Sequence, residues 1–168
     1  MPAPADPPGL RLDAVVAWLT ANGVPLTAPV MPTLLPGGRS NVTYRLVDAT
    51  GASVVLRRPP LGNVLPTAHD MAREHRVLTG LHRAGFPVPA PLALCADPDV
   101  TGAPFLAMEF VDGRIVATAT GAGALTEADR SATSAALVGA LADLHRIDVE
   151  AAGLADLGRP EGYLPRQL

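Results

Sequence analysis

The pattern of hydrophobic and polar positions predicts a short amphipathic helix near the start of the chain, followed by strands. Between Leu12 and Asn22 the apolar residues recur at helical spacing, and Gly23 stands where such a helix would stop. From Thr33 onward the apolar stretches shorten to strand length, over residues 33–38, 41–49 and 53–58. The Thr50-Gly51 pair is typical of a turn between two strands. We therefore predict one helix and then three antiparallel strands.

A second helix and two more strands are predicted in the middle of the chain. Thr67 is a candidate N-cap for a helix that runs through Ala84, with Gly85 as its stop. Three prolines then favour an extended segment that leads into a strand over 91–96. A further strand is predicted over 104–111. The Gly/Ala/Thr-rich segment that follows, through Gly123, is typical of a flexible connection.

A long helix is predicted after this connection. Thr126 and Asp129 have the spacing of a capping box. An apolar stripe then runs to the helix end near Asp148, through Leu137, Val138, Leu141, Leu144 and Ile147. The pattern indicates an α+β protein with a leader and helix over 1–32, a mixed lobe over 33–112, and a connection with the start of a helical lobe over 113–168.

Composition and charge narrow the classes of partner. Hydrophobic residues make up 48% and charged residues 17% of the 168, as in a globular domain. The formal net charge of −3 supplies no basic surface for nucleic acid or anionic lipid, so neither partner is expected. The chain has a single cysteine, Cys95, no signal peptide and no run of eighteen apolar residues, which predicts a cytoplasmic protein. We expect Cys95 and Trp18 to be packing residues.

The first candidate for chemistry is the turn Gly37-Gly38-Arg39-Ser40-Asn41. Its glycines would let backbone amides approach an anion closely, and Ser40 and Asn41 can donate hydrogen bonds as well. A simple hairpin turn explains the same residues without any function. The chain has no lysine, since all 13 of its basic residues are arginine, so a side-chain contact to phosphate must use a guanidinium.

The second candidate is Glu74, which lies at helical spacing with the apolar residues expected to face the sheet. A carboxylate on such a face needs a cationic partner. Arg57 is the best candidate, because alternation along the preceding strand places it on the same face as Val55, whereas Arg58 points the other way. The alternative is a surface pair between Glu74 and a helix neighbour, Arg73 or Arg76.

The order of these parts is that of a kinase N-lobe: a glycine turn, a strand that ends in a cation, a helix with a carboxylate, two strands and a linker. The chain resembles the aminoglycoside phosphotransferase family over roughly residues 33–166. The resemblance is carried by LPGGRSNVTYRLV, VVLRRPP, REHRVLTGL, FPVPAPLALCADPDVTGAPFLAMEFVDGR and LADLHRID. LRRPP, MEFVDGR and GRPEGYLPRQ are similar to the branch that occurs beside acyl-CoA dehydrogenase domains. The implied fold is a kinase-like N-lobe, an antiparallel sheet with one packed helix, plus the hinge and first helices of an incomplete C-lobe.

The resemblance implies a binding site for ATP. Ser40 and Asn41 would cover the phosphates. Arg57 would stand where the family often has a phosphate-binding lysine, and Glu74 would orient it. An arginine can bridge phosphate oxygens, but its planar head is larger than an ammonium group.

The resemblance also implies how the base would be held. Met108 would be the gatekeeper residue, with the Glu109 carbonyl and the Val111 amide bonding the adenine edge and Val55 stacking against the ring. Without the family context, Met108 and Phe110 are explained as ordinary strand core.

The residues expected to complete phosphoryl transfer do not occur in this chain. The family's His-Gly-Asp loop with its following Asn, and its later metal-binding Asp, are expected after LADLHRID, and neither occurs by Leu168. His145 belongs to a helix end, so we assign no catalytic residue and no metal ligand. The resemblance implies an ATP-dependent phosphotransferase acting on a small-molecule hydroxyl, with ATP and Mg²⁺ as cofactors and the Mg²⁺ ligands in a missing C-terminal part. As given, the chain should be inactive alone.

An alternative is a noncatalytic module that binds a nucleotide or a protein partner. The two hypotheses differ in solution behaviour. A shortened enzyme should self-associate through the uncovered stripe of the last helix, whereas a module of this kind should be monomeric.

Overall fold

The centre of the fold is a five-stranded antiparallel sheet. The computed structural model describes residues 7, 9–36, 41–60, 70–116, 121, 123–158 and 162. The strand order is β1-β2-β3-β5-β4, and every neighbouring pair is antiparallel. The strands are β1 (Met31–Leu34), β2 (Val42–Val47), β3 (Ser53–Arg58), β4 (Pro91–Cys95) and β5 (Phe105–Glu109). The predicted α+β class with an antiparallel sheet is confirmed, although β1 begins and ends earlier than the predicted 33–38.

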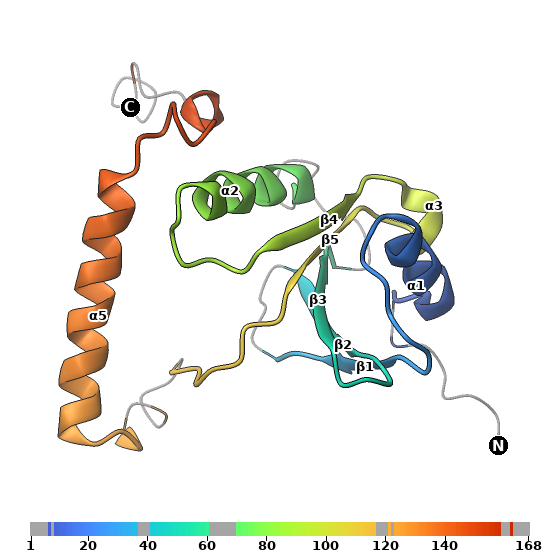
Figure 1. Cartoon of the computed structure of the whole chain (residues 1–168), viewed down its shortest axis with the longest axis horizontal. Coiled ribbons are helices and arrows are strands. Elements are labelled where there is room, and N and C mark those ends of the chain that lie inside the picture. The colour runs from blue at the N-terminus through green and yellow to red at the C-terminus, as the bar shows by residue number, and fades with distance from the viewer. Residues whose placement is uncertain are drawn as a thin grey trace.

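Two helices cover opposite faces of this sheet, and a third stands apart (Figure 1). Helix α1 spans Leu12–Ala21 and α2 spans Met71–Arg83, and the long helix α5 spans Glu127–Arg146. The short helix α3 (Pro98–Thr101) and the 3-10 helix η1 (Ala155–Leu157) complete the set. Asp97 is the N-cap of α3, where its carboxylate accepts from the Asp99 amide at 2.8 Å.

The ends of α2 show how local chemistry sets a helix boundary. The N-cap is Asp70, whose carboxylate accepts from the Arg73 amide at 2.9 Å. The prediction that the helix starts after Thr67 is therefore wrong, because Asp70 supplies the cap, and Thr67 itself lies outside the described residues. At the other end Gly85 adopts a φ of 76°, a left-handed conformation that favours glycine, as predicted.

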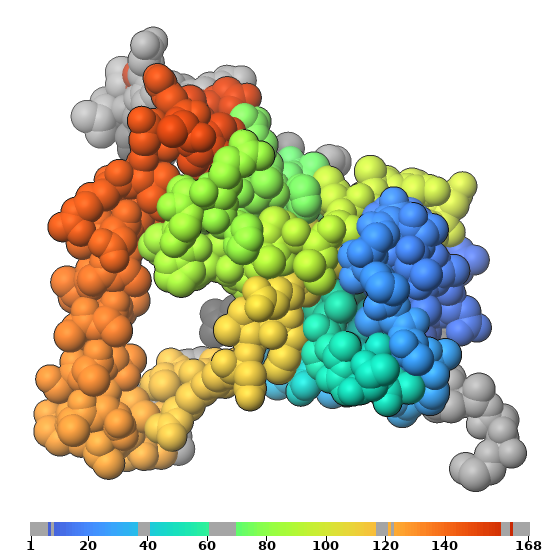
Figure 2. All heavy atoms as spheres, in the orientation of Figure 1, coloured from blue at the N-terminus to red at the C-terminus, as the bar shows by residue number. Residues whose placement is uncertain are grey.

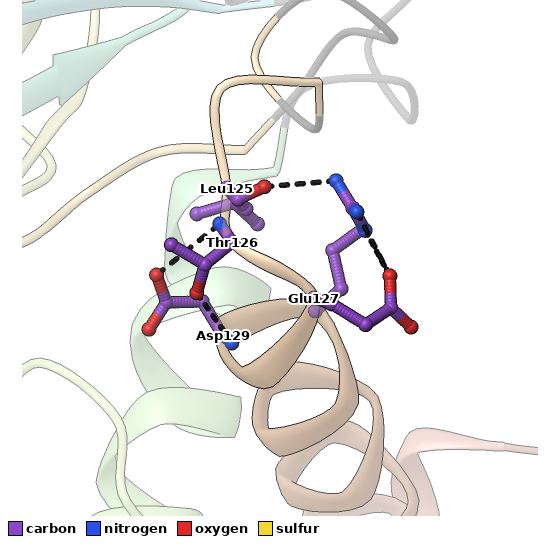
Figure 3. A network of polar contacts seen from close by, with 5 residues as sticks. Leu125, Thr126, Glu127 and Asp129 are labelled. Carbon is purple, nitrogen blue, oxygen red and sulfur yellow. Dashed lines mark hydrogen bonds and ion pairs between the residues drawn. The ribbon is translucent and has the colours of Figure 1, made fainter.

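The predicted capping box at the start of α5 is confirmed (Figure 3). The Thr126 hydroxyl accepts from the Asp129 amide at 3.1 Å, and the Asp129 carboxylate accepts from the Thr126 amide at 3.4 Å. Arg130 donates to the Leu125 carbonyl at 2.8 Å and to the Glu127 carboxylate, also at 2.8 Å. The two bonds of the capping box satisfy backbone amides at the helix start that the helix itself cannot satisfy.

Strand alternation divides the buried residues into two cores. Under α1, Val15 and Leu19 pack on Leu46 and Leu56, with Cys95 fully buried beside them. Trp18 is half-buried and meets Phe105 edge-to-face at 5.2 Å between ring centroids. The expectation that Trp18 and Cys95 are packing residues is confirmed.

The core under α2 is smaller and includes two of the predicted site residues. It consists of Val55, Met71, Leu106 and Met108, with Leu35, Leu78, Leu94 and Phe110 packed against them. Residues 54, 56 and 58 of β3 face α1, and residues 55 and 57 face α2. The predicted opposite directions of Arg57 and Arg58 are thereby confirmed.

Arg58 is a buried cation that ties three segments together. Its guanidinium donates to the carbonyls of Pro59 and Thr101, each at 3.2 Å, and to the carbonyl of Gly9. Burial lowers the pKa of the Arg58 guanidinium and raises that of the neighbouring Tyr44 hydroxyl. The residue thus joins the N-terminal segment, β3 and α3.

Helix α5 has the predicted apolar stripe but does not bury it within the described part of the chain. The side chains of Leu137, Val138 and Leu141 are 71%, 67% and 51% exposed. Figure 2 shows the helix standing away from the sheet, with the segment after its C-terminal end lying beside α2. None of the helices in the described ranges is long and apolar enough to cross a membrane. The cytoplasmic location stays a prediction.

The turn between β2 and β3 is organised by Asp48. Its carboxylate accepts from the amides of Thr50 at 2.8 Å and Ala52 at 3.0 Å, and from the Thr50 hydroxyl at 2.6 Å. A further bond from the Thr27 amide, at 3.0 Å, connects the turn to the loop after α1. These bonds, led by that of the Thr50 hydroxyl, lower the pKa of Asp48 to about 2.

We predict that Asp48 gives the protein an acid-sensitive component of stability. Because its pKa is lower when folded, protonation favours the unfolded chain, so the free energy of unfolding falls between about pH 5 and pH 2. Asp48→Asn should make this fall shallower in urea unfolding followed by circular dichroism. Asp13→Asn, at an exposed carboxylate of α1, should keep the wild-type slope. Equal slopes for Asp48→Asn and the wild type would contradict the prediction.

Candidate functional site

The candidate site is centred on an ion pair on the α2 side of the sheet. Arg57 comes from the end of β3 and Glu74 from the first turn of α2, and Arg57 Nε lies 3.0 Å from Glu74 Oε1. Asp70 fixes the start of the helix, since its carbonyl also accepts from the Glu74 amide at 3.1 Å. The expected pair between Arg57 and Glu74 is confirmed. Arg76, one of the alternative partners, binds Asp156 instead.

This pair is half-buried rather than enclosed. The Arg57 side chain is 35% exposed and that of Glu74 is 29% exposed. A guanidinium carries five N–H donors in one plane, so a group held through Nε by a carboxylate keeps a fixed orientation toward solvent. Solvent therefore reaches part of the Arg57 side chain while its Nε contacts Glu74.

The Gly-rich turn leads into the strand beside this pair. Ser40 lies outside the described residues, as do Gly37, Gly38 and Arg39. Asn41 is described and buried, immediately before β2. Since Thr43 of β2 lies opposite Arg57 of β3, the structure brings Asn41, Arg57 and Glu74 to one end of the sheet.

The predicted base-binding residues lie farther along the same face. Val55 and Met108 are buried partners across β3 and β5, and both belong to the core under α2. Val55 precedes Arg57 by two residues, about 7 Å along a strand. The buried apolar side chain of Val55 and the cationic side chain of Arg57 are therefore separated by the spacing of two strand residues.

The end of β5 is fixed by contacts to the chain before β4. The Glu109 amide donates to the Ala90 carbonyl at 2.9 Å, and the Glu109 carboxylate accepts from the Ala90 amide at 3.1 Å. The predicted contact to adenine concerns a different atom, the Glu109 carbonyl oxygen. Val111 follows in the extended linker, with its side chain 60% exposed.

Sequence reasoning missed Arg45 at this end of the sheet. Arg45 of β2 lies opposite Val55, donates to the Ser53 hydroxyl at 3.0 Å, and stacks over the Phe110 ring at 3.8 Å from its centroid. The signal was present, because the Thr50-Gly51 turn sets a register in which residue 45 faces residue 55. The contact makes Phe110 part of this face.

Two hollows of the described surface lie elsewhere. One of about 440 Å³ lies between the C-terminal ends of α2 and α5, and one of about 260 Å³ lies along the outer face of α2. Neither includes a predicted nucleotide-binding residue. In the part of the chain that the structure describes, no three His, Cys, Asp or Glu side chains are grouped to hold a metal ion.

The two adjacent arginines of β3 should differ sharply in their importance for stability. Arg57→Gln removes a half-exposed ion pair, which contributes about 1 kcal/mol or less to the free energy of unfolding. Arg58→Gln should cost about 2–4 kcal/mol, because it removes the donor that three backbone carbonyls share in a buried position. Urea unfolding of both variants measures the difference. Similar losses would show that Arg57 is also a structural residue.

The comparisons with known proteins concern the family and the fold. Residues 32–168 match the model of a family described as "Phosphotransferase enzyme family". A solved structure from Ralstonia eutropha JMP134, described as a "putative aminoglycoside phosphotransferase", matches with a TM-score of 0.72 at 32% identity, over 92% of this chain and 44% of that one. The antiparallel sheet with its helices has the kinase-like arrangement of that fold.

Curated relatives are much longer than this chain. Human acyl-CoA dehydrogenase family member 11 is 40% identical over 131 residues, 78% of this chain and 16% of the relative. Mouse acyl-CoA dehydrogenase family member 10 is 37% identical over 148 residues, 87% of this chain and 14% of the relative. The chain thus spans about a sixth of the length of the human relative and less than half of the solved structure.

Proposed function

The chain belongs to the phosphotransferase enzyme family, and from this membership we propose that it forms the nucleotide-binding part of an ATP-dependent kinase for a small-molecule hydroxyl. The observation that carries the proposal is the pair of Arg57 and Glu74, at 3.0 Å, at the end of the strand that also carries Val55. A nucleotide needs a cation for its phosphates and an apolar surface for its base, and we propose that Arg57 and Val55, on one face of β3, supply them.

At the phosphate end we propose that Arg57 binds phosphate oxygens while Glu74 holds its orientation. Asn41, and Ser40 before it, would add donors from the turn that precedes β2. An arginine contacts phosphate through a planar fork rather than through a single ammonium, so its orientation matters more than that of a lysine. Glu74 would therefore be needed to hold the Arg57 guanidinium in the orientation that phosphate binding requires.

At the base end we propose that adenine lies against Val55, with Met108 behind it. The Glu109 carbonyl and the Val111 amide would bond its polar edge. Buried apolar side chains around a few backbone groups are the usual composition of a small-molecule site. The stacked pair of Arg45 and Phe110 would border the slot.

For phosphoryl transfer we propose that further residues come from a segment C-terminal to those present here. Mg²⁺, bound with ATP, would supply charge neutralisation at the phosphates, and its protein ligands would lie in that segment. The acceptor would be a hydroxyl of a metabolite, such as one on an acyl chain, since the names of the relatives concern acyl-CoA dehydrogenases. The lobe boundary would lie near residues 112–113.

We predict that the chain binds Mg²⁺-ATP and that Arg57 dominates the affinity. Arg57→Ala should raise the Kd by about tenfold to a hundredfold, the loss of a charge-assisted hydrogen bond to phosphate, whereas Arg57→Lys should retain most of the affinity. Isothermal titration with Mg²⁺-ATP measures the effect. Arg73→Ala, at an exposed arginine beside Glu74, is the matched control and should leave the Kd unchanged. A wild-type chain that is folded but does not bind would refute the proposal.

The second candidate function is a noncatalytic nucleotide- or partner-binding module, and the exposed apolar stripe of α5 separates it from the first. We propose that the chain, as a shortened enzyme, self-associates through Leu137, Val138, Leu141 and Leu144, whereas a noncatalytic module would stay monomeric. Contiguous exposed apolar surface of this kind marks interaction sites.

The double substitution Leu137→Asp and Leu141→Asp should convert a self-associating chain to a monomer in sedimentation velocity at increasing concentration. The dissociation constant should rise by more than about tenfold, because two leucines lose burial. Ala132→Asp with Ala136→Asp adds the same charge on the opposite side of α5 and should leave association intact. A wild-type chain that stays monomeric at every concentration would count against self-association.

A further inference from the structure

Helix α2 is held on two sides, and only one of them is the sheet. Glu74 faces β3, where it meets Arg57. Arg76 is two residues later, about 200° around the helix, and contacts residues near the C-terminal end of the described chain. Figure 1 shows that end of the chain lying beside α2, and in Figure 2 its atoms cover part of the helix. We call residues 148–157 the strap.

The first contact between the strap and α2 is a fork of hydrogen bonds from Arg76. Arg76 Nη1 donates to Asp156 Oδ2 at 2.9 Å, and Nη2 donates to Asp156 Oδ1 and to the Gly153 carbonyl, the latter at 2.8 Å. The pair lowers the pKa of the Asp156 carboxyl and raises that of Arg76. A bidentate guanidinium contact fixes orientation as well as distance.

The second contact is independent of charge and lies one helical turn farther on, at Gly80. A Cβ atom at this position would lie 2.6 Å from the Ala152 carbonyl oxygen and 2.8 Å from Leu154 Cγ. Such distances are shorter than any tolerated contact, so the strap reaches the helix backbone only because residue 80 is glycine. Glycine inside a helix is otherwise unfavourable, and the close approach of the strap explains why it is accommodated here.

The strap has local structure of its own. The Asp148 carboxylate accepts from the amides of Glu150 at 2.9 Å and Ala151 at 3.0 Å, and the Asp148 carbonyl accepts from the Ala152 amide at 2.9 Å. The Leu154 amide donates to the Val149 carbonyl at 2.7 Å, and η1 follows. These hydrogen bonds give the strap a defined conformation of its own. Packing against α2 therefore fixes the conformation of few additional residues.

We propose that the strap holds α2 in the position at which Glu74 meets Arg57, and that Arg76, Gly80 and Asp156 are positioning residues for nucleotide binding. The proposal rests on the proposed function of Arg57. A half-exposed ion pair is too weak to fix a helix by itself, whereas a helix packed between a sheet and a strap has one position. Loss of the strap contacts should therefore change the position of α2, and with it the contact between Glu74 and Arg57.

Two variants remove the strap contacts by different means. Gly80→Ala places a methyl group against the Ala152 carbonyl, and Asp156→Asn weakens the fork without adding bulk. Each has a matched control on α5. Gly139→Ala adds a methyl group where nothing lies within 4 Å, and Asp143→Asn alters a surface pair with Arg146.

Two readouts separate positioning from binding. The first is the Nε–H signal of Arg57 in nuclear magnetic resonance, with Glu74→Gln as the reference for a lost pair, together with hydrogen exchange of α2 amides. The second is the Kd for Mg²⁺-ATP. We expect both strap variants to move the Arg57 signal toward the reference, to speed α2 exchange, and to raise the Kd by about threefold to tenfold, while both controls behave as wild type.

Other outcomes would contradict either the positioning of Glu74 by the strap or the binding of the nucleotide. If the strap variants leave the Arg57 signal unchanged, the strap does not position Glu74 and the proposal fails. If the Arg57 signal moves but the Kd does not, the strap residues do not act on nucleotide binding and the proposal fails in that respect. If the wild type binds no nucleotide but the signal still moves, the proposed function fails while the positioning of Glu74 by the strap stands.

Discussion

The alternation of side chains along β3 is the constraint on which the rest of the structure depends. Two of its residues, Val54 and Leu56, belong to the core under α1, Arg58 is buried on the same side, and the intervening Val55 and Arg57 face α2. A shift of one residue in its register would bury Arg57 under α1 and place Arg58 beside Glu74. Register is therefore a functional property here, because it decides which of two adjacent arginines is structural and which remains accessible.

The environment of each arginine follows from the partners on its face. Arg58 meets backbone carbonyls, which neutralise no charge, and its burial lowers its pKa. Arg57 meets a carboxylate and stays partly in water. A guanidinium in the first setting is a structural cross-link, and in the second it remains partly accessible to solvent. The chain uses the same residue type for both tasks because it contains no lysine.

The sequence pattern predicted the structure correctly where a local rule, such as strand alternation or capping-box spacing, applied to a segment. It predicted β3 at its observed bounds, the capping box of α5, and the pairing of Arg57 with Glu74. It failed at the start of α2, because Asp70 and Thr67 are both competent caps and only the position of the helix on the sheet selects between them. Periodicity could not predict that the stripe of α5 stays exposed in the described chain, since an apolar stripe indicates a face to be covered and not what covers it.

The contact between the strap and α2 was not predicted, because residues 148–157 have no repeating pattern. The contact also joins positions about eighty residues apart in sequence. The indication that the sequence did contain is a residue of α2, Gly80. A glycine in the middle of an otherwise good helix is costly unless another backbone approaches it. Gly80 was such a residue, and the approach of Ala152 accounts for it.

The path of the chain connects the two ends of the candidate site. From Glu109 at the end of β5 the chain runs through the linker and α5 into the strap, which returns to α2, the helix that carries Glu74. Helix α5 therefore lies, in sequence, between the segment that leaves β5 and the segment that packs on α2. Because Arg76 and Gly80 meet the strap on the same helix whose first turn carries Glu74, two segments about eighty residues apart in sequence contact one element of the candidate site.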